Sequence, residues 1–313
     1  GNFRVKVVSH DGTLAALGPQ SERPYDMGRN QTSLLVAGSR SSEPRGYGLQ
    51  GNYEPEAFSK DGKSLFVIRY LPARNPTSYQ VQRLDLLTGE VVGVYTPDEH
   101  LQQAMGGTAR IQAASPDGLR LYTLYTLDMG NGYTHAFIHV LALDELWAHC
   151  IDLPQDFALA PEKSTSLAVT PDGSKVYVVN STAQDVAVID AETLQVTETA
   201  PIDVASGSKT YATAAGNDGL YVASASRVLA LDEDLEETRR WHFSESVRGL
   251  QIARDVRRLY VGLRQVVAVI DPALDGVLEQ LDPPGVGNIR ELGPVVQPLE
   301  YASPRLEKFV CAC

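Results

Sequence analysis

The segment from Leu167 to Asn180, LAVTPDGSKVYVVN, decides the fold of this chain. Two short, largely apolar stretches flank a turn that ends in Asp-Gly. This arrangement is the strongest short-range signal for a β-hairpin, because Gly adopts the positive φ of a tight turn at no steric cost. The pattern occurs six times, and the sixth copy lacks the Gly. The other copies are VKVVSHDGTLAALG from Val5, EAFSKDGKSLFVIRY from Glu56, IQAASPDGLRLYTLYT from Ile111, ATAAGNDGLYVASA from Ala212 and LQIARDVRRLYVGL from Leu250.

The spacing of these copies indicates a repeat architecture. The turn aspartates are Asp11, Asp61, Asp117, Asp172, Asp218 and Asp255. Successive turns lie 50, 56, 55, 46 and 37 residues apart. After most copies a third apolar segment ends in Asp, and several copies have a fourth. The chain therefore repeats a unit of about four short strands.

Four short strands per repeat predict an all-β chain that folds as a single β-propeller of four-stranded antiparallel blades. We expect one domain over residues 1–313, with six blades counted and seven as the alternative. Residues 283–313, rich in Pro and Gly, are expected to form a tail, a cap or a closing strand. The expected blades cover residues 4–52, 53–96, 109–154, 164–202, 209–244 and 247–282.

An aromatic residue recurs in the second strand, where it is expected to pack between neighbouring blades. Ala16 replaces it in the first copy, and in the fifth copy it comes two residues earlier. The aromatic residues are Phe66, Tyr122, Tyr177, Tyr221 and Tyr260.

The fourth unit, KVYVVNSTAQDVAVIDAETLQV from Lys175 to Val196, resembles the YVTN-type (YncE-like) repeat of bacterial β-propellers. Tyr177 to Asn180 stand where that repeat has its Tyr-Val-Thr-Asn. The resemblance implies an exported propeller, either extracellular, periplasmic or on the outer face of a membrane anchor. It also implies a binding or scaffold protein without assigned activity. It transfers no catalytic residue, since the motif consists of structural positions.

Charge and composition exclude several classes of protein. The chain has 27 Lys and Arg against 39 Asp and Glu, a formal net charge of −12. An acidic chain is a poor sequence-independent nucleic-acid binder, because such binding needs basic residues to displace counterions. No apolar run reaches the roughly 18 residues of a membrane span. We therefore expect no nucleic-acid partner and no membrane span in this chain.

The first strand of each repeat supplies a candidate ligand site, because propellers bind ligands where these strands converge at the mouth of the axial channel. The position seven residues before each turn aspartate is occupied by Arg4, Glu54, Arg110, Thr165, Tyr211 and Arg248. Two residues later stand Lys6, Glu56, Gln112, Leu167, Thr213 and Leu250. Three arginines in six places suit a carboxylate or phosphate through charge-assisted hydrogen bonds. The alternative is that Glu54 and Glu56 neutralise the arginines in a channel that binds nothing.

Catalytic and metal chemistry finds less support. His135 and His139 form an H-x-x-x-H pair, but in a strand their side chains lie about 13 Å apart, too far to share a zinc ion. The chain has no G-x-S-x-G elbow and no phosphate-binding glycine motif, so we expect no catalytic residue, no metal and no cofactor. Glu54 and Glu56, about 6.5 Å apart on one face of a strand, leave acid–base chemistry open.

The cysteines and the long connections complete the candidates. Cys150, Cys311 and Cys313 are too few for a disulfide framework, and whether any of them form a disulfide stays open. Residues 19–31, 38–52 and 96–109 are expected to be loops, a common place for recognition residues.

These features together predict a non-catalytic binding or scaffold propeller that recognises a small anion at the channel mouth or a protein through its face loops. The alternative is a metal-dependent hydrolase of the lactonase type. A purely structural module is a third reading, in which the channel is empty.

Overall fold

Strands make up almost all of the regular structure in the computed structural model of the chain. Among the described residues, the exception is one short 3-10 helix, η1 (Gln155–Ala158). No helix in that part of the chain is long and apolar enough to cross a membrane. The structure describes residues 3–19, 28–39, 43–95, 105–130, 132–159, 164–214, 219–253, 257–274 and 277–281.

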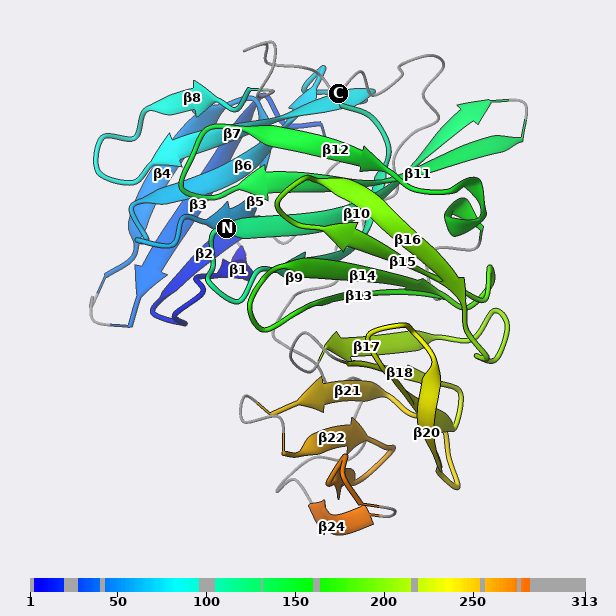
Figure 1. Cartoon of the computed structure of the whole chain (residues 1–313). Helices are drawn as coiled ribbons and strands as arrows, with labels where there is room; N and C mark the ends of the chain where they lie inside the picture. Colours follow the sequence, from blue (N-terminus) through cyan, green and yellow to red (C-terminus); the bar gives the residue numbers. More distant parts are fainter. Residues whose placement is uncertain are drawn as a thin grey trace. The chain divides into compact units, whose positions relative to one another are not determined.

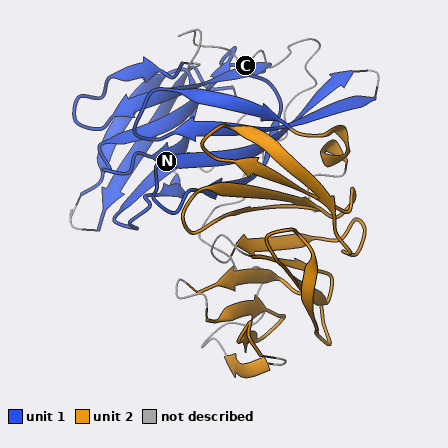
Figure 2. Cartoon of the chain, viewed as in Figure 1, with its two compact units in different colours: residues 1–152, 297–313 blue, residues 153–296 orange. Residues whose placement is uncertain are grey.

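The chain divides into two units, each with three four-stranded sheets (Figures 1 and 2). Unit 1 comprises residues 1–152 and 297–313, and unit 2 comprises residues 153–296. In unit 1, blade 1 contains β1 (Phe3–Val8), β2 (Leu14–Pro19), β3 (Gln31–Gly38) and β4 (Arg45–Gln50); blade 2 contains β5 (Asn52–Phe58), β6 (Ser64–Leu71), β7 (Ser78–Asp85) and β8 (Val91–Gly93); blade 3 contains β9 (Thr108–Ala114), β10 (Arg120–Gly130), β11 (Tyr133–Ala142) and β12 (Ala148–Asp152).

Unit 2 repeats the same plan three times. Blade 4 contains β13 (Thr165–Val169), β14 (Lys175–Asn180), β15 (Asp185–Asp190) and β16 (Gln195–Pro201); blade 5 contains β17 (Thr210–Ala214), β18 (Leu220–Ser224), β19 (Arg227–Leu231) and β20 (Glu237–His242); blade 6 contains β21 (Gly249–Ile252), β22 (Leu259–Gly262), β23 (Val267–Ile270) and β24 (Val277–Leu281).

Within every sheet the strands follow chain order, and each strand pairs antiparallel with the next. Six consecutive four-stranded antiparallel sheets are the blades of a β-propeller. The described residues therefore confirm the predicted fold class and the count of six blades. A seventh blade drawn from residues 283–313 would lie outside the described part of the chain.

The Asp-Gly turns join the first two strands of blades 1 to 4. Their glycines have φ of 70° at Gly12, 68° at Gly62, 73° at Gly118 and 77° at Gly173, the left-handed region that favours Gly. In blade 4, Asp172 Oδ1 accepts a hydrogen bond from the Ser174 backbone N–H at 3.0 Å, which closes the turn. The turn aspartates of blades 5 and 6, Asp218 and Asp255, lie outside the described residues.

The prediction that residues 38–52 form a loop was wrong, because residues 45–50 form β4, the fourth strand of blade 1. Tyr47 and Leu49 are buried on one face of this strand, whereas Gly46 and Gly48 are exposed on the other. The solvent-facing positions are occupied by glycines instead of polar residues, so the sequence does not show the alternation of apolar and polar residues that indicates a strand. Tyr47 is also fixed by its hydroxyl, which donates to the Leu86 carbonyl in blade 2 at 2.7 Å.

The cores lie between the faces of neighbouring blades. In unit 1, Leu34 and Tyr47 of blade 1 pack with Leu65 and Leu84 of blade 2. Phe66 of blade 2 belongs to a second cluster that includes Leu121 and Leu141 of blade 3. The predicted aromatic positions Phe66, Tyr122 and Tyr177 are buried, and Tyr221 packs partly buried against a cluster of blades 5 and 6.

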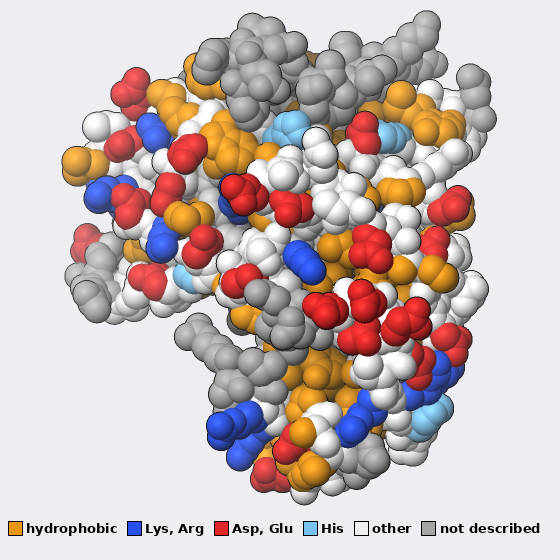
Figure 3. Space-filling view, in the orientation of Figure 1, with side chains coloured by type: hydrophobic (Ala, Val, Ile, Leu, Met, Phe, Trp, Pro, Cys, Tyr) orange, Lys and Arg blue, Asp and Glu red, His pale blue; other side chains and the backbone are white. Residues whose placement is uncertain are grey.

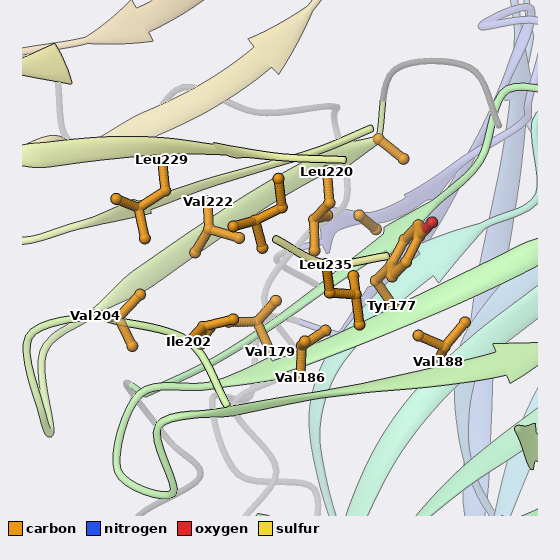
Figure 4. Close-up of a cluster of buried hydrophobic side chains, with 13 residues drawn as sticks. Tyr177, Val179, Val186, Val188, Ile202, Val204, Leu220, Val222, Leu229 and Leu235 are labelled. Carbon is orange, nitrogen blue, oxygen red and sulfur yellow. The ribbon is translucent and has the colours of Figure 1, made fainter. Parts of the chain in front are cut away.

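Unit 2 is built in the same way. Figure 4 shows Tyr177, Val179 and Val186 of blade 4 beside Leu220 and Leu229 of blade 5. All five are at most 1% exposed. Within each unit, neighbouring blades bury a face against one another, so these cores form only between repeats.

Asn180, the Asn of the YVTN-like motif, holds the end of β14 in place. Its side chain is fully buried and its amide donates to the Phe157 and Leu159 carbonyls at 3.1 and 3.2 Å. Its Oδ1 accepts from the backbone N–H groups of Thr182 and Ala183 at 2.8 and 3.1 Å. Asn180 therefore hydrogen-bonds to backbone groups of both the β14–β15 turn and the segment around η1.

Replacing Asn180 with Asp is expected to lower the free energy of unfolding by about 2–4 kcal/mol, because a carboxylate oxygen would then face two buried carbonyls. Urea unfolding followed by fluorescence measures the loss. Asn75→Asp, in a turn of blade 2, is the control and should change it by less than about 0.5 kcal/mol. Equal effects of the two changes would contradict the role assigned to Asn180.

Candidate functional site on the first strands of unit 1

The six predicted site residues are divided between the two units. Arg4, Glu54 and Arg110 lie on β1, β5 and β9, the first strands of the blades of unit 1. Thr165 and Tyr211 lie on β13 and β17, and Arg248 directly precedes β21, all in unit 2. The repeat register was thus sufficient to place each residue on, or next to, the first strand of its blade.

In unit 2 each of the three predicted residues contacts another residue of the same unit. Thr165 Oγ1 accepts a hydrogen bond from the Asn180 amide at 3.3 Å. Lys209 Nζ lies 4.9 Å from the centroid of the Tyr211 ring, in a cation–π contact. The Arg248 backbone N–H donates to the Gly262 carbonyl at 2.7 Å. Their role in ligand binding stays a prediction.

Unit 1 brings charged residues together around Glu54. The Glu54 side chain has no exposed surface, and its two oxygens pair with Lys6 Nζ at 3.0 Å and Arg29 Nη2 at 2.6 Å. The Lys6 and Arg29 side chains are only 8% and 12% exposed. An ionised carboxylate at this depth requires such partners, because burial without them costs several kcal/mol.

Arg29 was missed by the sequence analysis. It lies just before β3, in the stretch 19–31 that was expected to be a loop, and no repeat position marks it. Lys6 can lie beside Glu54 because Gly18 faces it from β2: a Cβ at Gly18 would lie 3.1 Å from Lys6 Cγ and 3.5 Å from Glu54 Oε2. Gly18, which follows the first Asp-Gly turn, is the sequence signal that could have indicated a side chain from another strand packed against this position.

β-Bulges distinguish the first strands of unit 1. The pairing shifts by one residue at Lys6 in β1, at Glu56 in β5 and at Arg110 in β9. A bulge turns the side chain of the extra residue away from the regular alternation. The first strands of blades 4 to 6 pair with their second strands without such a shift.

The bulge in β5 separates the two carboxyl groups, so the expectation that Glu54 and Glu56 act from one face is wrong. Glu54 contacts Lys6 on β1, whereas Glu56 Oε1 accepts a hydrogen bond from Gln112 Nε2 on β9 at 2.6 Å. Gln112 Nε2 lies 3.3 Å from Thr123 Oγ1 on β10, a second partner that holds the amide in place. Each carboxyl group therefore has its own environment.

The two carboxyl groups have different electrostatic surroundings. Glu56 is 6% exposed, and burial raises its pKa from 4.5 to about 8, against a smaller lowering by the hydrogen bond from Gln112. Glu56 is therefore neutral at pH 7. Glu54, by contrast, is paired with two cationic side chains, Lys6 and Arg29.

Positive charge exceeds negative charge at this place. Burial lowers the pKa of Lys6, and the nearby charges of Arg4 and Arg29 lower it further, while Glu54 opposes them. Arg4 is therefore within electrostatic range, and its side chain is exposed. In a protein of net charge −12, Lys6 and Arg29 thus contact Glu54, and Arg4 is a third cation close enough to act on Lys6. Figure 3 shows that Asp and Glu side chains are prominent on the face it draws.

The other candidates of the sequence analysis have structural contacts. Arg110 Nε donates to Thr126 Oγ1 on the adjacent β10 at 2.8 Å. His135 lies 2.9 Å from Asp152, and His139 is buried on the same strand, β11. Within the described ranges, no three His, Cys, Asp or Glu side chains gather as metal ligands would. Cys150 is buried, and Cys311 and Cys313 lie outside those ranges.

Comparison with known proteins yields structural similarity. No family model and no curated protein matches the chain. Among solved structures, the β-propeller domain of Cps50 (Swd1) from Myceliophteria thermophila is 13% identical, with 90% of this chain and 88% of that chain covered and a TM-score of 0.48. A putative 6-phosphogluconolactonase from Bacteroides fragilis is 14% identical, with 88% and 83% covered and a TM-score of 0.49. Neither similarity carries a functional assignment, and the YVTN-type repeat stays a resemblance.

Proposed function

We propose that this protein is a non-catalytic binding propeller that holds a small oxyanion on the first strands of unit 1. The observation that supports this is the excess of cations around Glu54. Arg4, Lys6 and Arg29 exceed the single ionised carboxylate by two formal charges. An oxyanion such as sulfate, phosphate or a carboxylate neutralises such an excess through charge-assisted hydrogen bonds.

The partial burial of the cluster strengthens the argument. Lys6 and Arg29 are largely removed from water, so their charges are screened less than those of surface residues. Arg4 is exposed, which leaves one cation of the group open to solvent and to an incoming anion. The proposal includes export of the protein, as the resemblance to the YVTN-type repeat implies.

The test is isothermal titration of the purified protein with sulfate, whose charge is constant between pH 5 and 10. Arg4→Gln is expected to weaken sulfate binding about tenfold, since a hydrogen bond between charged groups contributes about 1.5–3 kcal/mol. Arg45→Gln is the matched control. Arg45 is also exposed and belongs to the same blade, but it lies on β4, where it donates to the Leu87 carbonyl.

The control should change sulfate affinity less than twofold. Equal weakening in Arg4→Gln and Arg45→Gln would mean that sulfate senses only net charge, and no binding by the wild-type protein would refute the proposal. A thermal shift with divalent metal ions that a chelator removes would instead favour the hydrolase alternative.

A further inference from the structure

Two further arginines lie beside the cations of the proposed anion site. Arg69 is on β6 of blade 2 and is half-buried, and Arg74 is exposed in the connection between β6 and β7. No Asp or Glu among the described residues forms an ion pair with either arginine. Their guanidinium groups therefore keep donors that an anionic ligand can use.

Gly28 brings Arg74 next to Arg29. A Cβ at Gly28 would lie 2.5 Å from Arg74 Cα and 2.7 Å from Arg74 Cγ, so only a glycine lets the two chain segments touch here. Because Gly28 directly precedes Arg29, the Cα atoms of Arg29 and Arg74 lie within about 8 Å of each other. Arg29 pairs with Glu54, so Arg74 is a neighbour of that ion pair.

Gly51 brings Arg69 to the same place. Gly51 has a φ of 127°, and a Cβ there would lie 3.8 Å from Arg69 Nε. The Gly51 backbone N–H donates to the Asn30 carbonyl at 2.8 Å. Asn30 directly follows Arg29, so the Arg69 guanidinium lies beside the backbone segment that carries Arg29.

The connection that carries Arg74 is attached to the start of β5. Asn52, which is fully buried, donates from Nδ2 to the Ala73 carbonyl at 3.3 Å. Two residues later in the same strand, Glu54 is the one described carboxyl group that pairs with basic side chains here. The basic residues near the start of β5 are Arg4, Lys6, Arg29, Arg69 and Arg74.

We propose that the anion site extends over Arg69 and Arg74 and takes a small molecule that carries several phosphate or sulfate groups. The inference rests on the proposed function and names its class of ligand. One group of the ligand contacts the cations around Glu54, and a second group contacts Arg69 and Arg74 through charge-assisted hydrogen bonds. The second contact is intramolecular, which raises the affinity for the joined groups above that for one group alone.

The experiment titrates the protein with tripolyphosphate and with sulfate, in metal-free buffer of constant ionic strength at pH 7.5. The wild-type protein is expected to bind tripolyphosphate at least about tenfold more tightly than sulfate. Arg69→Gln and Arg74→Gln should each weaken tripolyphosphate binding about tenfold, the loss of one charge-assisted hydrogen bond. Both should change sulfate affinity less than twofold, whereas Arg4→Gln weakens the binding of both anions.

Each variant has a matched control in the same unit. Arg45 is exposed, like Arg74, and Arg83 is half-buried, like Arg69. Arg83 lies on β7 opposite Phe66, nearer the Asp-Gly turn of blade 2. Arg45→Gln and Arg83→Gln should change tripolyphosphate affinity less than twofold. Equal weakening in the variants and their controls would mean that tripolyphosphate senses only net charge, and this would overturn the inference.

The outcomes separate the two proposals. If Arg4→Gln weakens sulfate binding but Arg69→Gln and Arg74→Gln leave tripolyphosphate binding unchanged, the anion site stands and its extension is refuted. No binding of either anion by the wild-type protein would refute both proposals. Arg74 is exposed, so Arg74→Gln is expected to fold, and it decides alone if Arg69→Gln does not.

Sucrose octasulfate, titrated in parallel, distinguishes sulfated from phosphorylated ligands. Tighter binding of one of the two polyanions identifies that source, and either result supports the inference when Arg74→Gln weakens the binding. Binding of both polyanions that is no tighter than that of sulfate would overturn it.

Discussion

Replacing Glu54 with Gln is expected to lower the free energy of unfolding by about 3–5 kcal/mol, because it leaves Lys6 and Arg29 buried without a counter-charge. Both cations pair with this one carboxylate, which has no exposed surface. Urea unfolding at pH 7 and low salt measures the loss.

The exposed Glu90→Gln is the control for Glu54→Gln and should lose less than about 0.5 kcal/mol. Sulfate supplies a second readout, because an anion can take the place of the lost carboxylate. At equal sulfate concentration, the thermal midpoint of Glu54→Gln should rise more than that of the wild type. A loss below about 1 kcal/mol, with no extra effect of sulfate, would show that the cations do not depend on Glu54.

Replacing Glu56 with Gln is expected to remove a pH dependence of stability. The pKa of Glu56 is about 8 in the folded protein and 4.5 as its ordinary value, so between these values the folded state holds a proton that the unfolded state has released. Stability therefore falls as pH rises from about 4.5 to about 8, by about 1.4 kcal/mol for each pH unit, and is unaffected by Glu56 below this window.

Urea unfolding of both proteins at pH 5 and pH 8 measures this effect. Near pH 5 the two proteins should have similar free energies of unfolding, since a neutral Glu and a Gln are alike in charge. At pH 8 Glu56→Gln should be more stable than the wild type by about 3 kcal/mol. Parallel pH profiles would mean that Glu56 is ionised in the folded protein.

The hairpins and the blades could be predicted because their signals are local. An Asp-Gly turn needs only the residues on either side of it, as at Asp172 and Gly173, where the side chain of Asp172 closes its own turn. Counting such turns was enough to find six blades. The strand β4 was missed because its exposed glycines, Gly46 and Gly48, removed the polar half of the alternating pattern.

The candidate site could be predicted only in part. The repeat register placed Arg4, Glu54 and Arg110 on the first strands of their blades, because register along a strand is a local property. It assumed regular alternation, however, and the bulges at Lys6, Glu56 and Arg110 interrupt it. Arg29 belongs to no repeat, so nothing in the register pointed to its contact with Glu54.

The sequence by itself determined the class of fold, the six blades of the described residues and the strands that carry the candidate residues, because hairpins form between residues that are close along the chain. Only the tertiary structure decided which charges meet. Lys6 and Glu54 are 48 residues apart, and Glu56 and Gln112 are 56 apart. Pairing and burial across such separations depend on how neighbouring blades pack. These contacts decide whether a carboxyl group is paired with cations, as at Glu54, or has its pKa raised by burial, as at Glu56.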